Sequence, residues 1–239
     1  MSPCLRNHSN LSCAQLVQID LIDQVFCPLG KKMKGKLITF EGIDGSGKST
    51  QIKLLASELR RRGIDCIETQ EPGGTSLGKN LRRVLLETAE EVSSLAELLL
   101  FSADRAQHVE VLIKPALESD KVILSDRFYD STIAYQCAGR QLPRQIVNYL
   151  IEITTSGLKP DLTIFFDLPI REALRRKQGE NRMDFEDIEF YDRVRAAYLE
   201  IAANEPTRVR VVSALDSIEA IHSHVLHLVL RLLDKQSTS

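Results

Sequence analysis

The chain has 239 residues, of which 43% are hydrophobic and 27% are charged, and its formal net charge is −2. This composition is typical of a globular protein large enough to bury a core. The small net charge excludes a global field that attracts nucleic acid or an anionic membrane, and no apolar run reaches the roughly 18 residues that span a bilayer. The five cysteines are widely spaced without a C-x-x-C pair, which indicates reduced thiols and a cytoplasmic location.

Residues 1–32 differ from the rest of the chain. They hold three of the five cysteines, have no clear hydrophobic period, and lack the charged-then-apolar layout of a signal peptide. Met33 is followed almost at once by the first strand pattern. We expect a single folded domain over 33–239, and residues 1–32 to be either a disordered extension or the product of a mis-assigned start.

Short apolar runs alternate with longer helical patterns from residue 36 onward. The expected strands are 36–41, 64–69, 121–125, 162–167 and 207–212, and the expected helices are 48–62, 93–118, 187–203 and 216–234. Strands that alternate with helices predict an α/β fold of three layers, with a five-stranded parallel sheet covered by helices on both faces. The polar segment 177–186, which contains a glycine, is expected to be a short lid.

The first expected strand is followed by a glycine-rich loop, GIDGSGKS, which fits the pattern G-x-x-x-x-G-K-[ST]. Glycines let backbone N–H groups close on phosphates, and the helix that follows adds unpaired N–H donors and the positive end of its dipole. The pattern assigns Lys48 to the β and γ phosphates and Ser49 to Mg²⁺. The residues expected to bind ATP are Gly42, Ile43, Asp44, Gly45, Ser46, Gly47, Lys48, Ser49 and Thr50.

The third expected strand is followed directly by Asp126 and Arg127. A carboxylate at this end of a strand beside the loop is a suitable partner for Mg²⁺, directly or through water, although such an aspartate alone is more often a turn residue or a helix cap. Two reaction classes compete: hydrolysis by a switch or motor, and transfer of the γ-phosphate to a small acceptor. The chain has no N-K-x-D and no D-x-x-G after the second strand, whereas its many isolated arginines suit transfer between two anions.

Five sequence blocks resemble the thymidylate kinase family. F-E-G-x-[DE]-G-x-G-K-[ST]-[ST] matches 40–50, E-P-G-G-T matches 71–75, L-L-F-x-A-x-R matches 99–105, D-R-[FY]-x-x-S-x-x-A-Y-Q matches 126–136, and P-D-L-T-[IL]-x-[FLY]-D matches 160–167. The resemblance covers nearly all of residues 36–230. It implies a P-loop kinase fold, phosphorylation of dTMP to dTDP by in-line transfer from ATP with Mg²⁺, and a homodimer formed through helices like 93–118. The apolar block LAELLLF in that helix suits such an interface, but an intramolecular core explains it equally well.

The same resemblance implies an acceptor site for dTMP. Phe101 would stack on the thymine ring, and Arg105 would donate a hydrogen bond to its exocyclic oxygen. Thr132 and Gln136 would contact the edge of the base, while Tyr135 would press against the sugar and disfavour a 2′-hydroxyl. Ordinary core packing is the competing interpretation for Phe101 and Tyr135.

Charged residues are implied at the reacting end of the site. Arg127, together with Arg82, would hold the acceptor phosphate, and Asp44 would reach the sugar or the metal-bound phosphate. Loop positions 43–46 contain no arginine, so the chain resembles family members that supply a catalytic arginine from the lid. The candidates are Arg182, expected to act, and Arg175 and Arg176. Many lid-type members carry Asp-Arg where this chain has Asn181-Arg182, which leaves the choice among them open.

Two other functions stay open at this point. One is a kinase for another nucleoside monophosphate or for a deoxynucleoside. The other is a regulatory P-loop ATPase, which would release ADP without any small acceptor. His222, His224 and His227 share no spacing with a carboxylate, so we expect surface or packed histidines there and no metal site.

Overall fold

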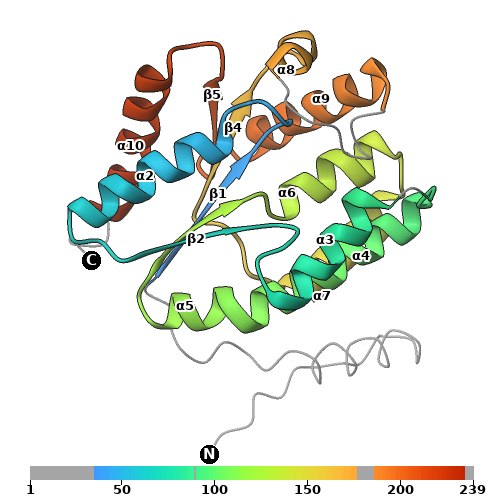
Figure 1. The fold of residues 1–239 in the computed structure, drawn as a ribbon, viewed down its shortest axis with the longest axis horizontal. Coiled ribbons are helices and arrows are strands. Elements are labelled where there is room, and N and C mark those ends of the chain that lie inside the picture. The colour runs from blue at the N-terminus through green and yellow to red at the C-terminus, as the bar shows by residue number, and fades with distance from the viewer. Residues whose placement is uncertain (1–34, 89, 177–185, 235–239) are drawn as a thin grey trace, which may run out of the picture. The chain divides into compact units, whose positions relative to one another are not determined.

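The computed structural model describes residues 35–88, 90–176 and 186–234 (Figure 1). The expectations for residues 1–32 and for most of the lid therefore lie outside the described residues. Five strands form one parallel sheet in the order β2-β3-β1-β4-β5. They are β1 Lys36–Glu41, β2 Cys66–Gln70, β3 Val122–Asp126, β4 Leu162–Asp167 and β5 Val209–Ser213.

Helices lie between these strands and after the last of them. They are α2 Lys48–Arg61, α3 Ser76–Glu87, α4 Ser94–His108, α5 Lys114–Glu118, α6 Tyr129–Thr132, α7 Arg144–Thr155, α8 Ile170–Arg176, α9 Ile188–Asn204 and α10 Ile218–Asp234, with π-helical segments η1 Val109–Ile113 and η2 Ile133–Gly139. None of the described helices is both long enough and apolar enough to cross a membrane.

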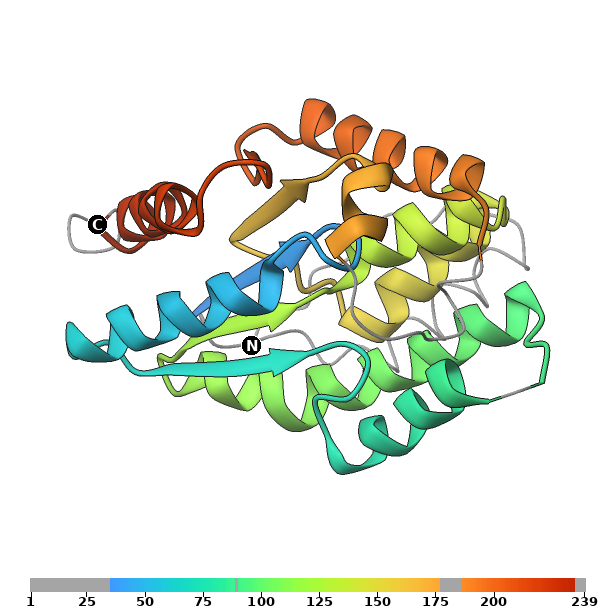
Figure 2. The same ribbon diagram turned by 45° about the horizontal axis from the view of Figure 1, so that its top comes forward.

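The sheet is covered on both faces, as the sequence predicts. Helices α2 and α10 contact each other on one face, whereas α5 and α9 contact strands from the other face (Figures 1 and 2). Leu37 of β1 packs into one hydrophobic cluster, and its neighbours Ile38 and Phe40 pack into the second. Because both faces are buried, the inner residues of the strand are apolar except for Thr39.

The expected helix 93–118 is interrupted in the structure. It consists of α4, the π-helical turn η1, and α5. Pro115 lies at the start of α5 and has no N–H to donate to the preceding turn, which accounts for the local widening of the helix. Helices α3 and α7 were not predicted from the sequence. Helix α7 is rich in β-branched residues, which have low helix propensity.

The strand register brings the sequence blocks to one edge of the sheet. Phe40 of β1 pairs with Asp126 of β3, and Gln70 of β2 pairs with the same residue. The loops that follow these three strands therefore start side by side. They carry the glycine-rich loop, the E-P-G-G segment and the D-R-F segment.

Candidate active site

The glycine-rich loop has the backbone that a phosphate cradle requires. Gly42 has a φ of 136°, and a Cβ there would lie 2.7 Å from the Phe166 carbonyl oxygen, so no larger residue fits. Gly47 has a φ of 92° and directly precedes α2. Ser46 Oγ is buried without a hydrogen-bond partner among the described residues. This orphaned hydroxyl fits a ligand that accepts hydrogen bonds in the loop.

Lys48 lies beneath this loop and is buried. Its Nζ donates to the carbonyl oxygens of Gly42 and Ile43, at 3.0 Å and 3.2 Å, and lies 3.8 Å from Asp44 Oδ1. Burial lowers the pKa of the Lys48 ammonium, and the positive charge of Arg127 lowers it further. A buried ammonium held by neutral carbonyls is ready to exchange them for phosphate oxygens, which match its charge far better.

Ser49 and Asp126 meet beside the loop. Ser49 Oγ donates to Asp126 Oδ2 at 2.9 Å, and Ser49 is exposed. No cluster of three or more histidine, cysteine, aspartate or glutamate side chains suited to a metal occurs in the described part of the chain. A hydroxyl and one carboxylate fit Mg²⁺, which takes oxygen ligands and keeps water and substrate phosphates in its coordination sphere.

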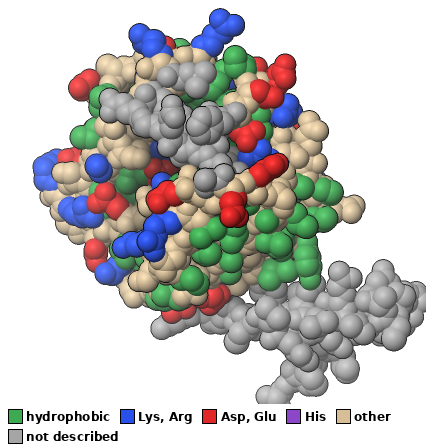
Figure 3. All heavy atoms as spheres, turned by 45° about the vertical axis from the view of Figure 1, so that its right-hand side comes forward, with side chains coloured by type: hydrophobic (Ala, Val, Ile, Leu, Met, Phe, Trp, Pro, Cys, Tyr) green, Lys and Arg blue, Asp and Glu red, His purple; other side chains and the backbone are tan. Residues whose placement is uncertain are grey.

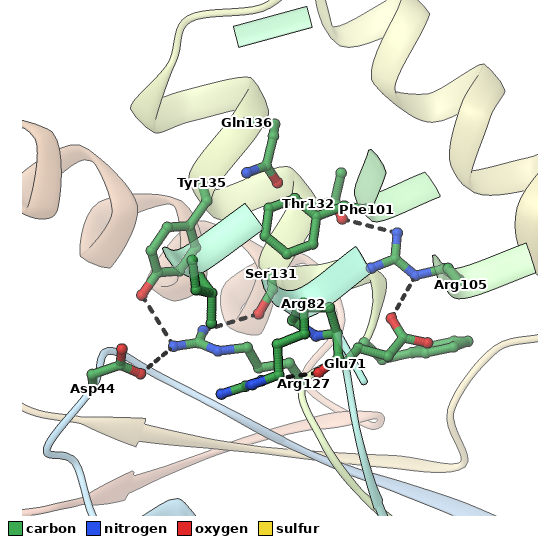
Figure 4. Close-up of a pocket in the computed structure, with 13 residues that line it drawn as sticks. Asp44, Glu71, Arg82, Phe101, Arg105, Arg127, Ser131, Thr132, Tyr135 and Gln136 are labelled. Atoms are coloured by element: carbon green, nitrogen blue, oxygen red, sulfur yellow. Dashed lines mark hydrogen bonds and ion pairs between the residues drawn. The ribbon is translucent and has the colours of Figure 1, made fainter. Parts of the chain in front are cut away.

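Arg127 connects this loop to a second pocket. Its NH2 group donates to Asp44 Oδ1 at 2.8 Å, and its NH1 group donates to Ser131 Oγ at 3.1 Å. The guanidinium also lies 5.0 Å from the centroid of the Tyr135 ring (Figure 4). Burial alone would raise the pKa of Asp44, but the charges of Arg127 and Lys48 hold it well below the ordinary value. Asp44 is therefore an anion that lies between two cations, the Arg127 guanidinium and the Lys48 ammonium, and holds both in place.

The backbone of Arg127 is held in a strained conformation. Its φ of 71° lies in the left-handed region that disfavours residues with a Cβ. Its N–H donates to the Phe40 carbonyl oxygen at 2.9 Å, and its own carbonyl oxygen accepts from Ser125 Oγ at 2.7 Å. Glu41 Oε1 accepts from the next backbone N–H, that of Phe128, at 2.8 Å. These three bonds fix the direction in which the arginine leaves the sheet.

Sequence reasoning missed Glu41. It is completely buried, and its Oε2 also accepts from Ser131 Oγ at 2.5 Å and from the Tyr198 hydroxyl at 2.8 Å. Burial, together with the negative charge of Asp130, raises its pKa to about 7. The signal available in the sequence was a charged residue at the end of an otherwise buried strand, directly before the glycine-rich loop.

The residues expected to bind the acceptor line one pocket (Figure 4). Those predicted are Asp44, Arg82, Phe101, Arg105, Arg127, Thr132, Tyr135 and Gln136. Glu71, Pro72, Leu86, Phe128 and Ser131, which were not predicted, complete the lining. The pocket therefore combines the flat ring of Phe101 with the buried guanidinium of Arg105 at one end. Arg82 and Arg127 lie at the other end.

Residues behind the pocket fix the side chains that line it. Gln136 Nε2 donates to the buried carboxylate of Glu97 at 2.9 Å, and Arg140 donates to the same carboxylate at 3.1 Å and 3.2 Å. The Tyr135 ring packs edge-on against Phe190, with centroids 6.1 Å apart. Phe101 is half-buried and faces the pocket, so its environment differs from that of a core phenylalanine.

Known proteins resemble this chain over the region that contains these sequence blocks. A sequence model of the family described as "Thymidylate kinase" matches residues 40–225. The chain belongs to the thymidylate kinase family. A thymidylate kinase from Halothermothrix orenii is 47% identical over 203 residues, which cover 82% of this chain and 97% of the relative. One from Pelodictyon phaeoclathratiforme is 45% identical over 205 residues, covering 81% and 94%.

A solved structure agrees with this assignment. The crystal structure of thymidylate kinase from Ehrlichia chaffeensis is 37% identical in sequence, covers 82% of this chain and 98% of its own, and has a TM-score of 0.69. The five-stranded parallel sheet and its surrounding helices are consistent with the fold of this thymidylate kinase.

The lid arginines of this thymidylate kinase family member are placed only in part. Arg182 lies outside the described residues. Arg175 and Arg176 end α8, and both donate to Glu172; Arg176 NH1 also donates to the Ala214 carbonyl oxygen at 2.8 Å. Glu186, the last residue of the segment expected to form a lid, has its Oε1 2.6 Å from Arg140 NH1.

Proposed function

We propose that this chain transfers the γ-phosphoryl group of ATP to dTMP, with Mg²⁺, to give dTDP and ADP. Family membership and the relatives' names support the reaction class. The observation that carries the proposal is the ion pair of Asp44 with Arg127, 2.8 Å long, which joins the phosphate cradle to the acceptor pocket. A donor held by the loop and an acceptor held by the pocket would meet end to end at this pair.

The acceptor is itself a phosphate anion, so the reaction needs no strong general base. Lys48 would hold the donor's β and γ oxygens and offset the charge that spreads over them during transfer. Arg127 and Arg82 would hold the acceptor phosphate, and the Asp44 carboxylate would keep Arg127 aimed at it or reach the sugar. Ser49 and Asp126 would hold Mg²⁺, which when bound neutralises phosphate charge and orients the oxygens for in-line attack.

The base is assigned to the deep end of the pocket. Phe101 would stack on the thymine ring, while Arg105 and the amide of Gln136 would form hydrogen bonds to its edge, beside Thr132. Tyr135 is buried between Arg127 and Phe190, so it has little freedom to move away from an added 2′-hydroxyl. Burial raises the pKa of Tyr135 to about 12, which keeps the phenol neutral beside a phosphate.

The reaction is tested with a panel of acceptors. Purified protein is incubated with ATP, Mg²⁺ and each of several nucleoside monophosphates and deoxynucleosides, and ADP is followed. We expect dTMP to give the fastest release. Faster release with another acceptor would assign the chain a different substrate, and release without any acceptor would favour a regulatory ATPase.

We further propose that the chain forms a homodimer through the outer faces of α3, α4 and α7. Hydrophobic side chains gather on the side of the molecule that carries these helices (Figure 3). The large exposed residues there are Leu77, Val84, Leu95, Leu99, Ile146 and Tyr149, each 46–50% accessible. A patch of this kind favours association in water.

Cys66 and Cys137 are free thiols, which fits a protein that works in the reducing cytoplasm.

A further inference from the structure

Arg105 is held on two sides and left open on the third. The residue is 2% exposed. Its Nε donates to Glu71 Oε2 at 2.8 Å, and its NH1 donates to Thr132 Oγ1 at 2.9 Å. The structure gives its NH2 group no hydrogen bond to another described residue, and Figure 4 shows that nitrogen pointing into the pocket beside Phe101. The open edge of the guanidinium is therefore the part available to a ligand.

Glu71 has almost no freedom to move. Its Oε1 lies 2.9 Å from His108 Nδ1, and because an ionised carboxylate only accepts, Nδ1 is the donor. The other ring nitrogen of His108 lies 2.7 Å from Thr69 Oγ1 on β2. A Cβ added at Gly74 would lie 2.5 Å from this nitrogen, so the backbone of Gly74 packs directly against the imidazole. A rigid series of contacts thus runs from Thr69 on β2 through His108 and Glu71 to Arg105.

A buried guanidinium requires such a partner. Without a counter-charge its burial is costly, and without a fixed acceptor on Nε its plane can rotate about the last side-chain bonds. Glu71 supplies both the charge and the direction, and His108 fixes Glu71. Neither residue has a role in the phosphoryl transfer proposed above: Glu71 lines the pocket, and the fully buried His108 contacts Glu71.

We propose that Glu71 and His108 are positioning residues that aim Arg105, and thereby set the preference for a pyrimidine with a carbonyl at ring position 4 over one with an amino group there. This inference rests on the proposed function. A guanidinium only donates hydrogen bonds, so its fixed edge pairs with the 4-carbonyl of thymine and meets the 4-amino group of cytosine donor to donor. A rigid donor discriminates strongly, whereas an arginine free to turn aside does not.

The test compares dissociation constants for dTMP and dCMP, with the KM for ATP as a separate readout. Glu71→Asp keeps the charge but withdraws the carboxylate, and Glu71→Gln keeps the shape but removes the charge. We expect the preference for dTMP over dCMP to fall by about tenfold or more in both variants, with the KM for ATP unchanged. Glu58→Gln is the matched control, because Glu58 accepts from Arg61 Nε at the surface end of α2 and should leave the preference unchanged.

A second pair of variants separates positioning from folding. Asparagine places its amide nitrogen near the position of Nδ1, so His108→Asn retains a hydrogen-bond donor to Glu71. Glutamine places its amide nearer the position of Nε2, so His108→Gln keeps the contact with Thr69 and loses the one with Glu71. We expect the preference to survive in the first and fall in the second. The inference is overturned if His108→Asn and His108→Gln show the same preference for dTMP over dCMP. It is also overturned if the Glu71 variants bind dTMP, dCMP and ATP more weakly to the same extent. Wild-type protein that fails to phosphorylate dTMP would instead overturn the proposed function.

Discussion

Replacing Glu41 by glutamine should change how the stability of the protein depends on pH. The carboxylate is completely buried and accepts from a backbone N–H and two hydroxyls. A glutamine of the same shape can accept the Phe128 N–H with its oxygen and donate to the two hydroxyl oxygens with its nitrogen. The variant therefore retains the contacts and removes only the charge.

The magnitude follows from the pKa of Glu41, which rises from an ordinary value of 4.5 to about 7, chiefly through burial. Between these values the folded state keeps a proton that the unfolded chain has already released. The wild-type protein therefore loses stability as pH rises through this window, and the loss is complete above the folded pKa. At about 1.4 kcal/mol per pH unit, the total loss attributable to Glu41 is about 3 kcal/mol.

The assay is the free energy of unfolding from denaturant titration, measured from about pH 4.5 to about pH 8 for wild type and Glu41→Gln. All other titrating groups are shared, so the difference between the two curves isolates Glu41. We expect the difference to move by about 3 kcal/mol in favour of the variant as pH rises. A difference that stays constant across this range would show that the buried carboxyl does not titrate there, and would refute the reasoning.

A control carboxylate should behave differently. The Glu58 side chain accepts from Arg61 and Arg62, whose hydrogen bonds lower its pKa to about 2. Its contribution to stability is present above pH 4.5 and is lost only as the pH falls below that value. Glu58→Gln should therefore track wild type in parallel over the range in which Glu41→Gln diverges.

The remaining predictions concern transfer and assembly. Lys48→Ala should abolish phosphoryl transfer while circular dichroism and the unfolding midpoint stay close to wild type, because its two bonds are to loop carbonyls; near-normal turnover would contradict the role of the loop. Arg182→Ala should lower kcat by about 100-fold or more, as expected for a lost charge-stabilising donor, and unchanged turnover would assign the role to Arg175 or Arg176. Leu99→Asp should convert a dimer to a monomer in light scattering, whereas Leu199→Asp, an exposed leucine on α9, should not; a dimer in both would place the interface elsewhere.

Much of the fold was predictable because local signals were strong. The strands at 36–41 and 162–167 were predicted to the residue, since apolar runs buried on both faces end at charged residues. The strands at 64–69 and 207–212 lie one or two residues further along the chain than expected, because hydrogen-bonded turns precede them. The hydrophobic pattern predicted one continuous helix over 93–118, and the break in it lies just before Pro115, which has no N–H to donate to the preceding turn.

Sequence by itself determined the residue types and spacings of the glycine-rich loop and, through resemblance, most of the residues that line the pocket proposed for the acceptor. Those patterns are local, and each block carries its own chemistry. The tertiary structure decided which residues hold that chemistry in place. Glu41, at the end of β1, holds the backbone of Phe128 after β3. Glu71, after β2, holds Arg105 and contacts His108, both on α4. These elements meet only in the folded structure. A buried carboxylate has no periodicity to mark it, so only its partners reveal its role.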